Sequence, residues 1–297
     1  MNLTDIAIFV GAVDAGSLAE AARRAGIPPL MASRRLAALE DEIGARLLNR
    51  TTRALALTTQ GETFLPHARA LLDTETAGRA SVGGQQDQAS GLLRLTASVA
   101  FGRKIVTPLL VRFMERHPAL QVDLMLTDSI VDIVGQGFDL ALRIALLRDN
   151  SLVARRLSDN PRRLYAAPAY LRRAGKPKTP ADLARHQCLA LGDTSHWVFI
   201  QDGKNRTGRK TLRQKIGGRL KLNSIDAIHQ ACLDGAGIAL LAEWDAREDV
   251  ASGKLSPLAL AGHVPEPLGI WAVYPSARLL PHKVRLFVDY LQREIRR

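Results

Sequence analysis

The stretch 17–48, SLAEAARRAGIPPLMASRRLAALEDEIGARLL, decides the fold at the start of this 297-residue chain. Its pattern predicts two helices joined by a tight turn. The Ser17 hydroxyl can cap the first helix, and Glu20 follows three residues later, so the two can form a capping box. Gly26 can end this helix in the left-handed conformation, because glycine has no Cβ to clash there.

The second helix is expected over residues 29–43. Pro28 and Pro29 suit its first turn, where their missing N–H groups would find no partner inside the helix anyway. Its polar face is basic, because the stretch 21–39 holds four arginines and no acid, whereas an acidic cluster follows at residues 40–42. This polarity suits a helix whose N-terminal half enters a DNA major groove. The alternative is an ordinary helical hairpin with a solvated basic face.

The neighbouring residues favour the DNA-binding interpretation. Residues 3–15 predict a further helix that completes a three-helix unit. After the second helix of the pair, LLNRTTRALALT places Arg50, Thr51 and Arg53 in a basic turn that an alternating, strand-like stretch follows. We expect a β-wing beside the helices, and phosphate contacts are the natural task of these three side chains.

The order of these motifs resembles the DNA-binding end of the LysR-type transcriptional regulators. The resemblance covers the capped helix, the SRR helix, the LEDEIGARLLNRTTR wing and a following TxxGE, and it continues more loosely through nearly the whole chain. Family members usually carry a Ser-Gln pair, whose glutamine often contacts a base edge, where this chain has two prolines. The resemblance therefore implies that other side chains contact the DNA, and that Leu30 and Met31 make apolar contacts with thymine methyls. The predicted DNA-binding residues are Leu30, Met31, Ser33, Arg34, Arg35, Arg50, Thr51 and Arg53.

A helix of about 25 residues is expected after the wing. Thr59 and Glu62 predict a second capping box at its start, and Gly83-Gly84 marks its end. One long face is apolar, which favours burial against a second copy of the chain, as a homodimer or a tetramer. Two heads related by a two-fold axis would prefer an inverted-repeat operator on double-stranded DNA. The alternative is that this helix packs on its own chain.

From Gly91 the pattern changes to strands that alternate with helices, which predicts an α/β unit with a mainly parallel sheet. Helices are expected over 102–117 and 130–136. The chain then crosses near Pro161 into a second segment and returns with LGIWAVYP and a helix at 281–293. The resemblance implies a periplasmic-binding-protein-like effector domain with two lobes. We therefore expect a winged helix-turn-helix domain at 1–58, a linker helix at 59–90 and an effector domain at 91–297, with lobe 1 at 91–161 and 266–297 and lobe 2 at 162–265.

A cleft between two such lobes is a usual place for a small ligand. Hydroxyls, backbone amides and one guanidinium could bind a small carboxylate there. The predicted effector-binding residues are Ser98, Phe101, Thr127, Asp128, Arg143, Asn223 and Ser224. For each of them the alternative is a helix cap or a surface contact, and Arg143 could instead pair with Asp139.

The net charge of +12 is concentrated in one part of the chain. Residues 161–221 hold 15 Lys and Arg against 3 Asp and Glu, and the run 204–219 has seven cations and no acid. Most such runs are solvated surface, and glycines at both ends predict an exposed β-hairpin. A DNA-backbone contact or the attraction of an anionic effector are the sharper alternatives. The DNA-binding argument depends on the first sixty residues and not on the isoelectric point.

Other functions have little support in the sequence. Cys188 and Cys232 are the only cysteines, which predicts neither disulfides nor a metal site but two buried small side chains in a reducing cytoplasm. No signal peptide and no run of 18 apolar residues is present, so neither export nor a membrane is expected. HExxH, CxxC, GxSxG and Walker motifs are absent, which favours a non-enzyme without cofactors. The rival interpretation is a soluble solute-binding or enzymatic α/β protein with an incidental helical N-terminus.

Overall fold

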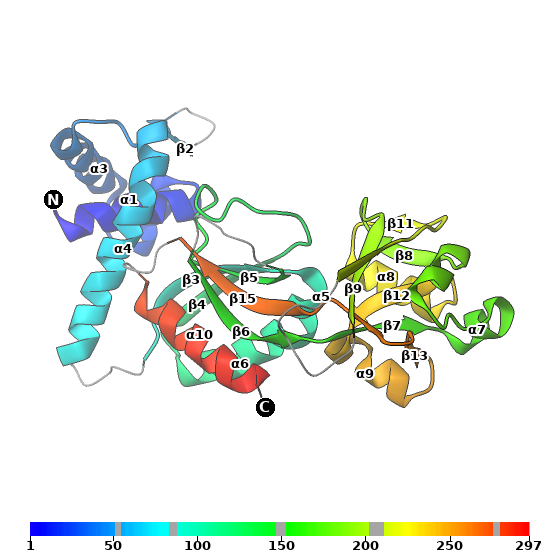
Figure 1. Ribbon diagram of the computed structural model, residues 1–297. Helices are drawn as coiled ribbons and strands as arrows, with labels where there is room; N and C mark the ends of the chain where they lie inside the picture. The colour runs from blue at the N-terminus through cyan, green and yellow to red at the C-terminus, as the bar shows by residue number, and fades with distance from the viewer. Residues whose placement is uncertain (51–54, 83–87, 147–152, 202–210, 276–279, 297) are drawn as a thin grey trace.

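The computed structural model shows a helical head, a long helix and two α/β lobes along one line (Figure 1). It describes residues 1–50, 55–82, 88–146, 153–201, 211–275 and 280–296. Among the described helices, none combines the length and the apolar character needed to cross a bilayer.

The head is a winged helix-turn-helix unit, as predicted. Its elements are α1 (Leu3–Ala15), α2 (Leu18–Arg24), α3 (Pro29–Ile43) and the antiparallel wing strands β1 (Leu48–Arg50) and β2 (Leu55–Leu57). Phe9, Leu36 and Leu39 are fully buried where the helices meet. This small core fixes how α3 is presented to a partner.

The caps of the first helices follow the sequence only in part. The Ser17 hydroxyl accepts a hydrogen bond from the Glu20 amide at 3.4 Å, and Gly26 adopts a φ of +66°, as predicted. The Glu20 carboxylate, however, does not complete the capping box but binds Arg23 and Arg24 on the same helix. That half of the prediction is wrong, because two guanidiniums one turn away bind a carboxylate more strongly than one amide does.

The long helix α4 (Thr59–Val82) follows the wing. Its capping residue is Thr58, whose hydroxyl accepts a hydrogen bond from the Gly61 amide at 2.9 Å. The capping box predicted at Thr59 and Glu62 is therefore wrong, because the cap lies one residue earlier and the residue three positions after it is a glycine. The first turns bury Leu65 and Ala68 against the head, which agrees with packing on its own chain. Leu71, further along, is exposed.

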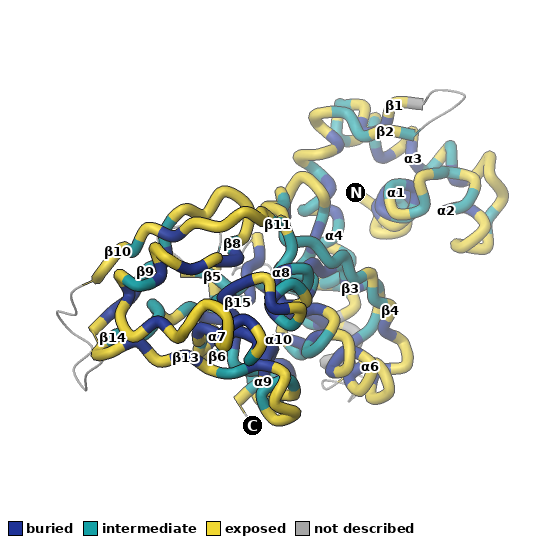
Figure 2. Tube along the Cα trace, turned by 90° about the vertical axis from the view of Figure 1, so that its right-hand side faces the viewer, coloured by how far each residue is buried: buried dark blue, intermediate teal, exposed yellow. Residues whose placement is uncertain are grey.

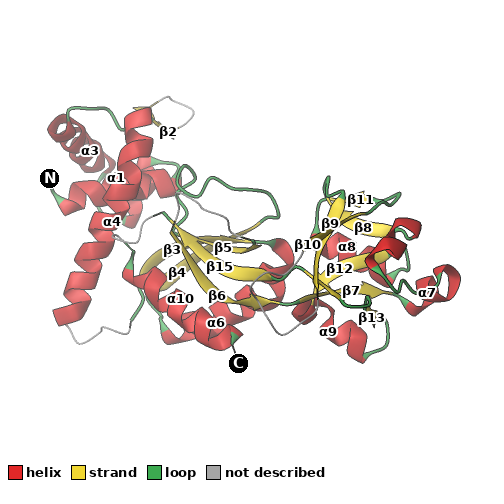
Figure 3. Cartoon of the chain, viewed as in Figure 1, coloured by secondary structure: helices red, strands yellow, loops and turns green. Residues whose placement is uncertain are grey.

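Lobe 1 is a five-stranded sheet in the order β4-β3-β5-β15-β6 (Figure 3). Strand β3 pairs in parallel with β4 and β5, while β15 runs antiparallel to β5 and β6. The bounds are β3 (Gly91–Ala97), β4 (Leu120–Leu126), β5 (Leu140–Ala145), β6 (Val153–Asn160), β15 (Leu268–Tyr274), α5 (Val99–Phe101), η1 (Gly102–Val106), α6 (Thr107–Arg116) and α10 (His282–Ile295). Strand β15 and helix α10, which come last in the chain, therefore complete lobe 1, as predicted.

The helix predicted over 130–136 is wrong. This stretch is a loop that ends in a tight turn over residues 133–137. The Asp132 carboxylate accepts hydrogen bonds from the Val134 and Gly135 amides, at 3.1 and 3.0 Å, and Gly137 takes a φ of +66°. An aspartate that binds the amides two and three residues on favours a turn over a helix interior.

Lobe 2 contains a five-stranded sheet, β11-β8-β12-β7-β13, and a three-stranded sheet, β10-β9-β14. The antiparallel β9–β10 pair confirms the predicted hairpin, whose connecting residues 202–210 lie outside the described chain. The bounds are β7 (Arg162–Ala166), β8 (Cys188–Leu191), β9 (His196–Gln201), β10 (Thr211–Lys215), β11 (Lys221–Leu222), β12 (Ile238–Ala242), β13 (Ser256–Leu258), β14 (His263–Pro265), α7 (Pro168–Ala174), η2 (Pro180–Arg185), α8 (Ile225–Leu233) and α9 (Glu243–Ala251).

Both cysteines belong to the core of lobe 2. Cys188 packs with Trp197 and Phe199, whereas Cys232 packs in a separate cluster with Tyr165. Burial raises the pKa of each thiol to about 12. The expectation of two buried small side chains is therefore confirmed.

Two chain crossings join the lobes. Strand β6 ends one residue before Pro161 and β7 begins one residue after it, while two residues separate β14 from β15. The tube view shows buried segments toward the inside of the molecule and exposed segments around them (Figure 2). The buried clusters of lobe 1 and lobe 2 are separate, so each lobe has its own core.

Candidate DNA-binding head and effector cavity

The start of α3 presents an exposed face with mixed chemistry. Leu30 is 65% exposed and Met31 43% exposed, which is unusual for apolar side chains unless they meet a partner. Arg34 is also exposed, and within the described chain no acid lies within ion-pair distance of it. Ser33 is half-buried beside them. This face can offer both apolar contacts and a guanidinium to base edges.

The structure places the remaining predicted DNA contacts differently. Arg35 is bound to Asp5 of α1 at 2.9 Å, so its guanidinium fastens the recognition helix to the first helix. The side chain of Arg50 and all of Thr51 and Arg53 lie outside the described residues. The predicted phosphate contacts of the wing therefore stay predictions.

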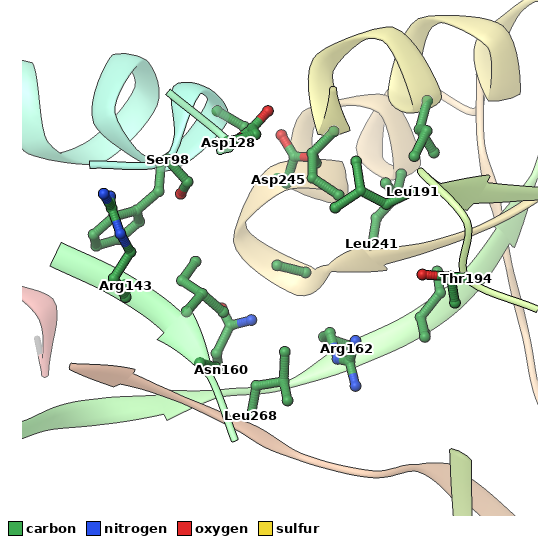
Figure 4. A pocket seen from close by; sticks show the side chains of 18 of the residues that line it. Ser98, Asp128, Arg143, Asn160, Arg162, Leu191, Thr194, Leu241, Asp245 and Leu268 are labelled. Carbon is green, nitrogen blue, oxygen red and sulfur yellow. The ribbon is translucent and has the colours of Figure 1, made fainter. Parts of the chain in front are cut away.

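A cavity of about 670 Å³ lies between the two lobes (Figure 4). Five of the predicted effector residues line it, namely Ser98, Phe101, Thr127, Asp128 and Arg143. Asn223 and Ser224 are not among the residues that line this cavity, so their contact with an effector stays a prediction. Ser224 occupies the N-cap position of α8 without a side-chain capping bond, and this helix presents Ile225 and Ile228 to the cavity. A residue before a helix faces a cleft only where the helix axis points into it.

Several lining residues were missed from the sequence. They are polar or charged and come from both lobes and both crossings: Asn160, Arg162, Thr194, His196, Asp245 and Glu266. The predicted crossing near Pro161 was the one available signal for the first two, because residues beside a crossing adjoin the cleft. The others come from elements that only the folded chain brings together.

Arg143 reaches into the cavity from β5 with only neutral partners. Its guanidinium donates to the Thr96 hydroxyl at 3.2 Å and to the Leu142 carbonyl at 3.3 Å. Burial lowers the pKa of Arg143, and the nearby Asp128 raises it in part. The alternative pairing with Asp139 is wrong, because that carboxylate accepts a hydrogen bond from the Arg94 amide at 2.9 Å instead.

Arg162 is the second guanidinium at the cavity and belongs to the crossing. One of its terminal nitrogens donates to the Glu266 carbonyl at 2.7 Å, and its Nε is buried without a hydrogen-bond partner. Burial lowers the pKa of Arg162 to about 10. A guanidinium that has lost water without gaining a carboxylate is a favourable place for an anion.

Ion pairs join the lobes beside the cavity. Lys104 of η1 binds the Asp245 carboxylate at 2.5 Å, and the neighbouring Arg103 binds Asp226 at 3.0 Å. His229 lies 3.2 Å from Asp245 and 2.9 Å from Asp249. Burial raises the pKa of Asp245, but its bonds to His229 and Lys104 outweigh this and keep it below its ordinary value. These contacts hold the lobes in the observed arrangement.

The fold and the cavity define a class of protein: a winged helix-turn-helix head joined to a two-lobed ligand-binding domain. Residues 3–62 match the bacterial regulatory helix-turn-helix protein, lysR family, and residues 86–296 match the LysR substrate binding domain. The chain belongs to the LysR-type transcriptional regulators, as the sequence resemblance predicted.

Individual relatives agree with this assignment. The chain is 33% identical over 297 residues to the transcriptional regulator DmlR of Escherichia coli K12, covering 98% of this chain and 93% of the relative. It is 30% identical to CrgA of Neisseria meningitidis serogroup C, with 99% and 97% covered. The solved structure of CrgA from Neisseria meningitidis matches with a TM-score of 0.61 at 30% identity, covering 99% of both chains. The rival interpretation as a solute-binding protein or an enzyme is not supported, because these relatives are named as transcriptional regulators.

Proposed function

We propose that this regulator binds an inverted-repeat operator as a homodimer or tetramer in the cytoplasm and responds to a small anionic effector, such as a carboxylate, in the inter-lobe cavity. The observation that carries the effector proposal is the pair Arg143 and Arg162. Within the described chain, neither guanidinium has a carboxylate within ion-pair distance, and both have a pKa lowered by burial.

An anion would relieve the unfavourable desolvation of these two cations. Carboxylates match the planar guanidinium fork, so binding can be bidentate. Apolar side chains such as Ile144, Trp197 and Leu268 form much of the remaining wall. An acid with a short hydrocarbon body fits such a lining better than an inorganic anion does.

Effector binding can change DNA binding only if the ligand prefers one arrangement of the protein over another. Arg143 belongs to the sheet of lobe 1, whereas Arg162 starts the first strand of lobe 2. A ligand held by both side chains would therefore favour one relative position of the lobes. We propose that this shift alters the placement of the DNA-binding heads within the oligomer.

On the DNA side, we propose that Leu30, Met31, Ser33 and Arg34 contact base edges. The exposed apolar pair at the start of α3 supports this role, since it suits thymine methyls. Arg35 would contribute less than the sequence suggested, because Asp5 already binds it. Exposed positions along the second half of α4 supply the surface on which a second copy would pack.

The DNA proposal is tested by retaining fragments of source-organism genomic DNA on the purified protein at near-physiological salt and sequencing them. Discrete sites that share an inverted repeat are the expected result. Arg34→Met should lose this selection, whereas Arg172→Met, a matched change at an exposed arginine of lobe 2, should keep it. Retention without sequence preference would refute the proposal.

The effector proposal is tested by calorimetric titration of a panel of short mono- and dicarboxylates into the full-length protein. At least one acid should bind, and Arg143→Met and Arg162→Met should each weaken it by about tenfold or more, the equivalent of one charge-assisted hydrogen bond. Arg112→Met on the exposed face of α6 is the matched control. Binding that survives the loss of both cavity arginines would contradict the assignment.

A further inference from the structure

The segment 127–137 between β4 and β5 reaches from the effector cavity to the long helix α4. Residues 127–131 and Ile133 line the cavity. At its other end the Gly137 carbonyl accepts a hydrogen bond at 2.7 Å from Arg69 of the long helix α4. One continuous stretch of chain thus contacts both the candidate ligand site and the helix that carries the head.

The part of the segment from Asp132 to Phe138 is a turn held by its own hydrogen bonds. The Asp132 carboxylate bonds the amides of Val134 and Gly135, and the Phe138 amide donates to the Ile133 carbonyl at 2.9 Å. Ile133 and Phe138 are both buried in one small apolar cluster. A displacement of Ile133 at the cavity is therefore passed to Gly137 through the bonded turn.

Arg69 joins three parts of the molecule at one point. Its side chain is only 12% exposed, and besides Gly137 it binds the Asp14 carboxylate near the end of α1 at 2.5 Å. Asp14 also lies 3.8 Å from Arg94 of β3, whose guanidinium sits over the Phe138 ring. The linker helix, the head and lobe 1 therefore meet in one network of charged and polar groups.

We propose that Arg69 and the segment 127–137 couple the occupancy of the cavity to the position of the head. A ligand that displaces Ile133 changes the position of the Gly137 carbonyl at the far end of the same turn. Because the same guanidinium binds Asp14, that change alters the seating of α1 on lobe 1. The coupling rests on the proposed function, since it requires an effector in the cavity. Poorly solvated contacts of this kind are kept or broken as a unit, which suits a switch.

The contact between Arg69 and Gly137 requires a glycine on the side of lobe 1. The φ of +66° at Gly137 favours glycine, and a Cβ there would lie 2.1 Å from an Arg69 terminal nitrogen. Gly137→Ala should therefore break the hydrogen bond between Arg69 and Gly137 by a change in lobe 1. Arg69→Met should break the same bond by a change in α4, and it retains most of the length of the side chain. The two variants test one contact from opposite sides.

Hydrogen–deuterium exchange of the ligand-free, full-length protein tests the coupling. Arg69→Met should raise the exchange rates of the Ser129, Val134 and Gly135 amides by about fivefold or more, the lower end of usual coupling between sites. Gly137→Ala should raise the exchange at residues 16–17, where the amides close the end of α1, although it contacts neither.

Lys283→Met is the matched control. Lys283 joins the same lobe to α4 by binding Asp73 at 2.9 Å, and it lies 3.7 Å from Asp139, which is outside the segment 127–137. The proposal expects this variant to leave the exchange at Ser129 unchanged. An equal effect of Lys283→Met and Arg69→Met, or faster exchange spread evenly over both lobes, would overturn the proposal.

The exchange experiment distinguishes a failure of the coupling through Arg69 from a failure of the proposed anionic effector. If Arg69→Met fails to fold, Gly137→Ala alone decides, because unchanged exchange at residues 16–17 overturns the coupling. Neither operator nor effector enters the measurement. A failure of the coupling therefore leaves the anionic effector untouched, and a failed carboxylate titration leaves the exchange result standing.

Discussion

Replacing Lys104 by methionine should destabilise the pair of lobes far more than the same change at its neighbour Arg103. Both cations lie on η1 and bind a carboxylate of lobe 2, so the two changes are matched in element and in direction. The two ion pairs differ in burial. The Lys104 and Asp245 side chains are 29% and 1% exposed, whereas those of Arg103 and Asp226 are 58% and 28% exposed. Burial should therefore decide which ion pair matters.

The magnitude follows from what each change leaves behind. Lys104→Met removes hydrogen bonds to both the carboxylate and the backbone carbonyl of Asp245 and leaves a buried charge with His229 as its remaining partner. Removing one partner of a buried pair costs about 3–5 kcal/mol, and the remaining histidine should reduce the loss to about 2–4 kcal/mol. An exposed pair contributes about 0–1 kcal/mol, which bounds the loss in Arg103→Met.

Urea unfolding followed by tryptophan fluorescence measures the difference. Trp244 adjoins Asp245 and donates to the Asn160 side chain across the lobes at 2.7 Å, so its emission should report the separation of the lobes. The double variant Lys104→Met/Asp245→Asn should recover part of the lost free energy, because no unpaired charge remains. Equal small losses in the two single variants would refute the reasoning from burial.

The remaining predictions concern pH, packing, reactivity and charge. Because the pKa of Asp245 lies below its ordinary value of 3.8, its contribution should be complete above that pH and lost below it, which acid unfolding of wild type and Asp245→Asn can compare. Gly61→Ala would place a Cβ 2.1 Å from a backbone carbonyl and should lower the free energy of unfolding by about 2 kcal/mol or more, as measured in urea. Iodoacetamide at pH 8 should label Cys188 and Cys232 only after unfolding, and labelling of the native protein would contradict their burial. If the basic hairpin touches phosphates, reversing the charge of the exposed Arg213 should weaken binding equally for all DNA sequences, whereas an unchanged salt slope would assign it to solvated surface.

The local features of the head could be predicted because neighbours in sequence are neighbours in space there. The Ser17 cap, the Gly26 turn and the wing each depend on a few consecutive residues. The errors arose where one side chain had to choose between partners. Glu20 binds arginines and not the cap amide, and Asp132 bonds the amides of a turn and not those of a helix.

The cavity shows the opposite case. Ser98, Asp128 and Arg143 could be expected there because strand ends of one sheet meet at one edge. For Arg162 the predicted crossing near Pro161 was the available signal. Asp245 had none, because only the packing of α9 in the folded chain brings it to the cavity.

The sequence by itself determined the basic recognition helix, since capping residues, hydrophobic periodicity and turn residues act over short separations. The resemblance of its motifs to the LysR-type regulators implied the class of the protein and the two lobes. Only the tertiary structure decided which charges are paired and which are left to a ligand. Arg35 and Lys104 bind carboxylates, whereas Arg143 and Arg162 donate hydrogen bonds only to neutral groups. The physical reason is that Coulomb energy and desolvation depend on distance and burial in space, and separation along the chain does not fix either quantity.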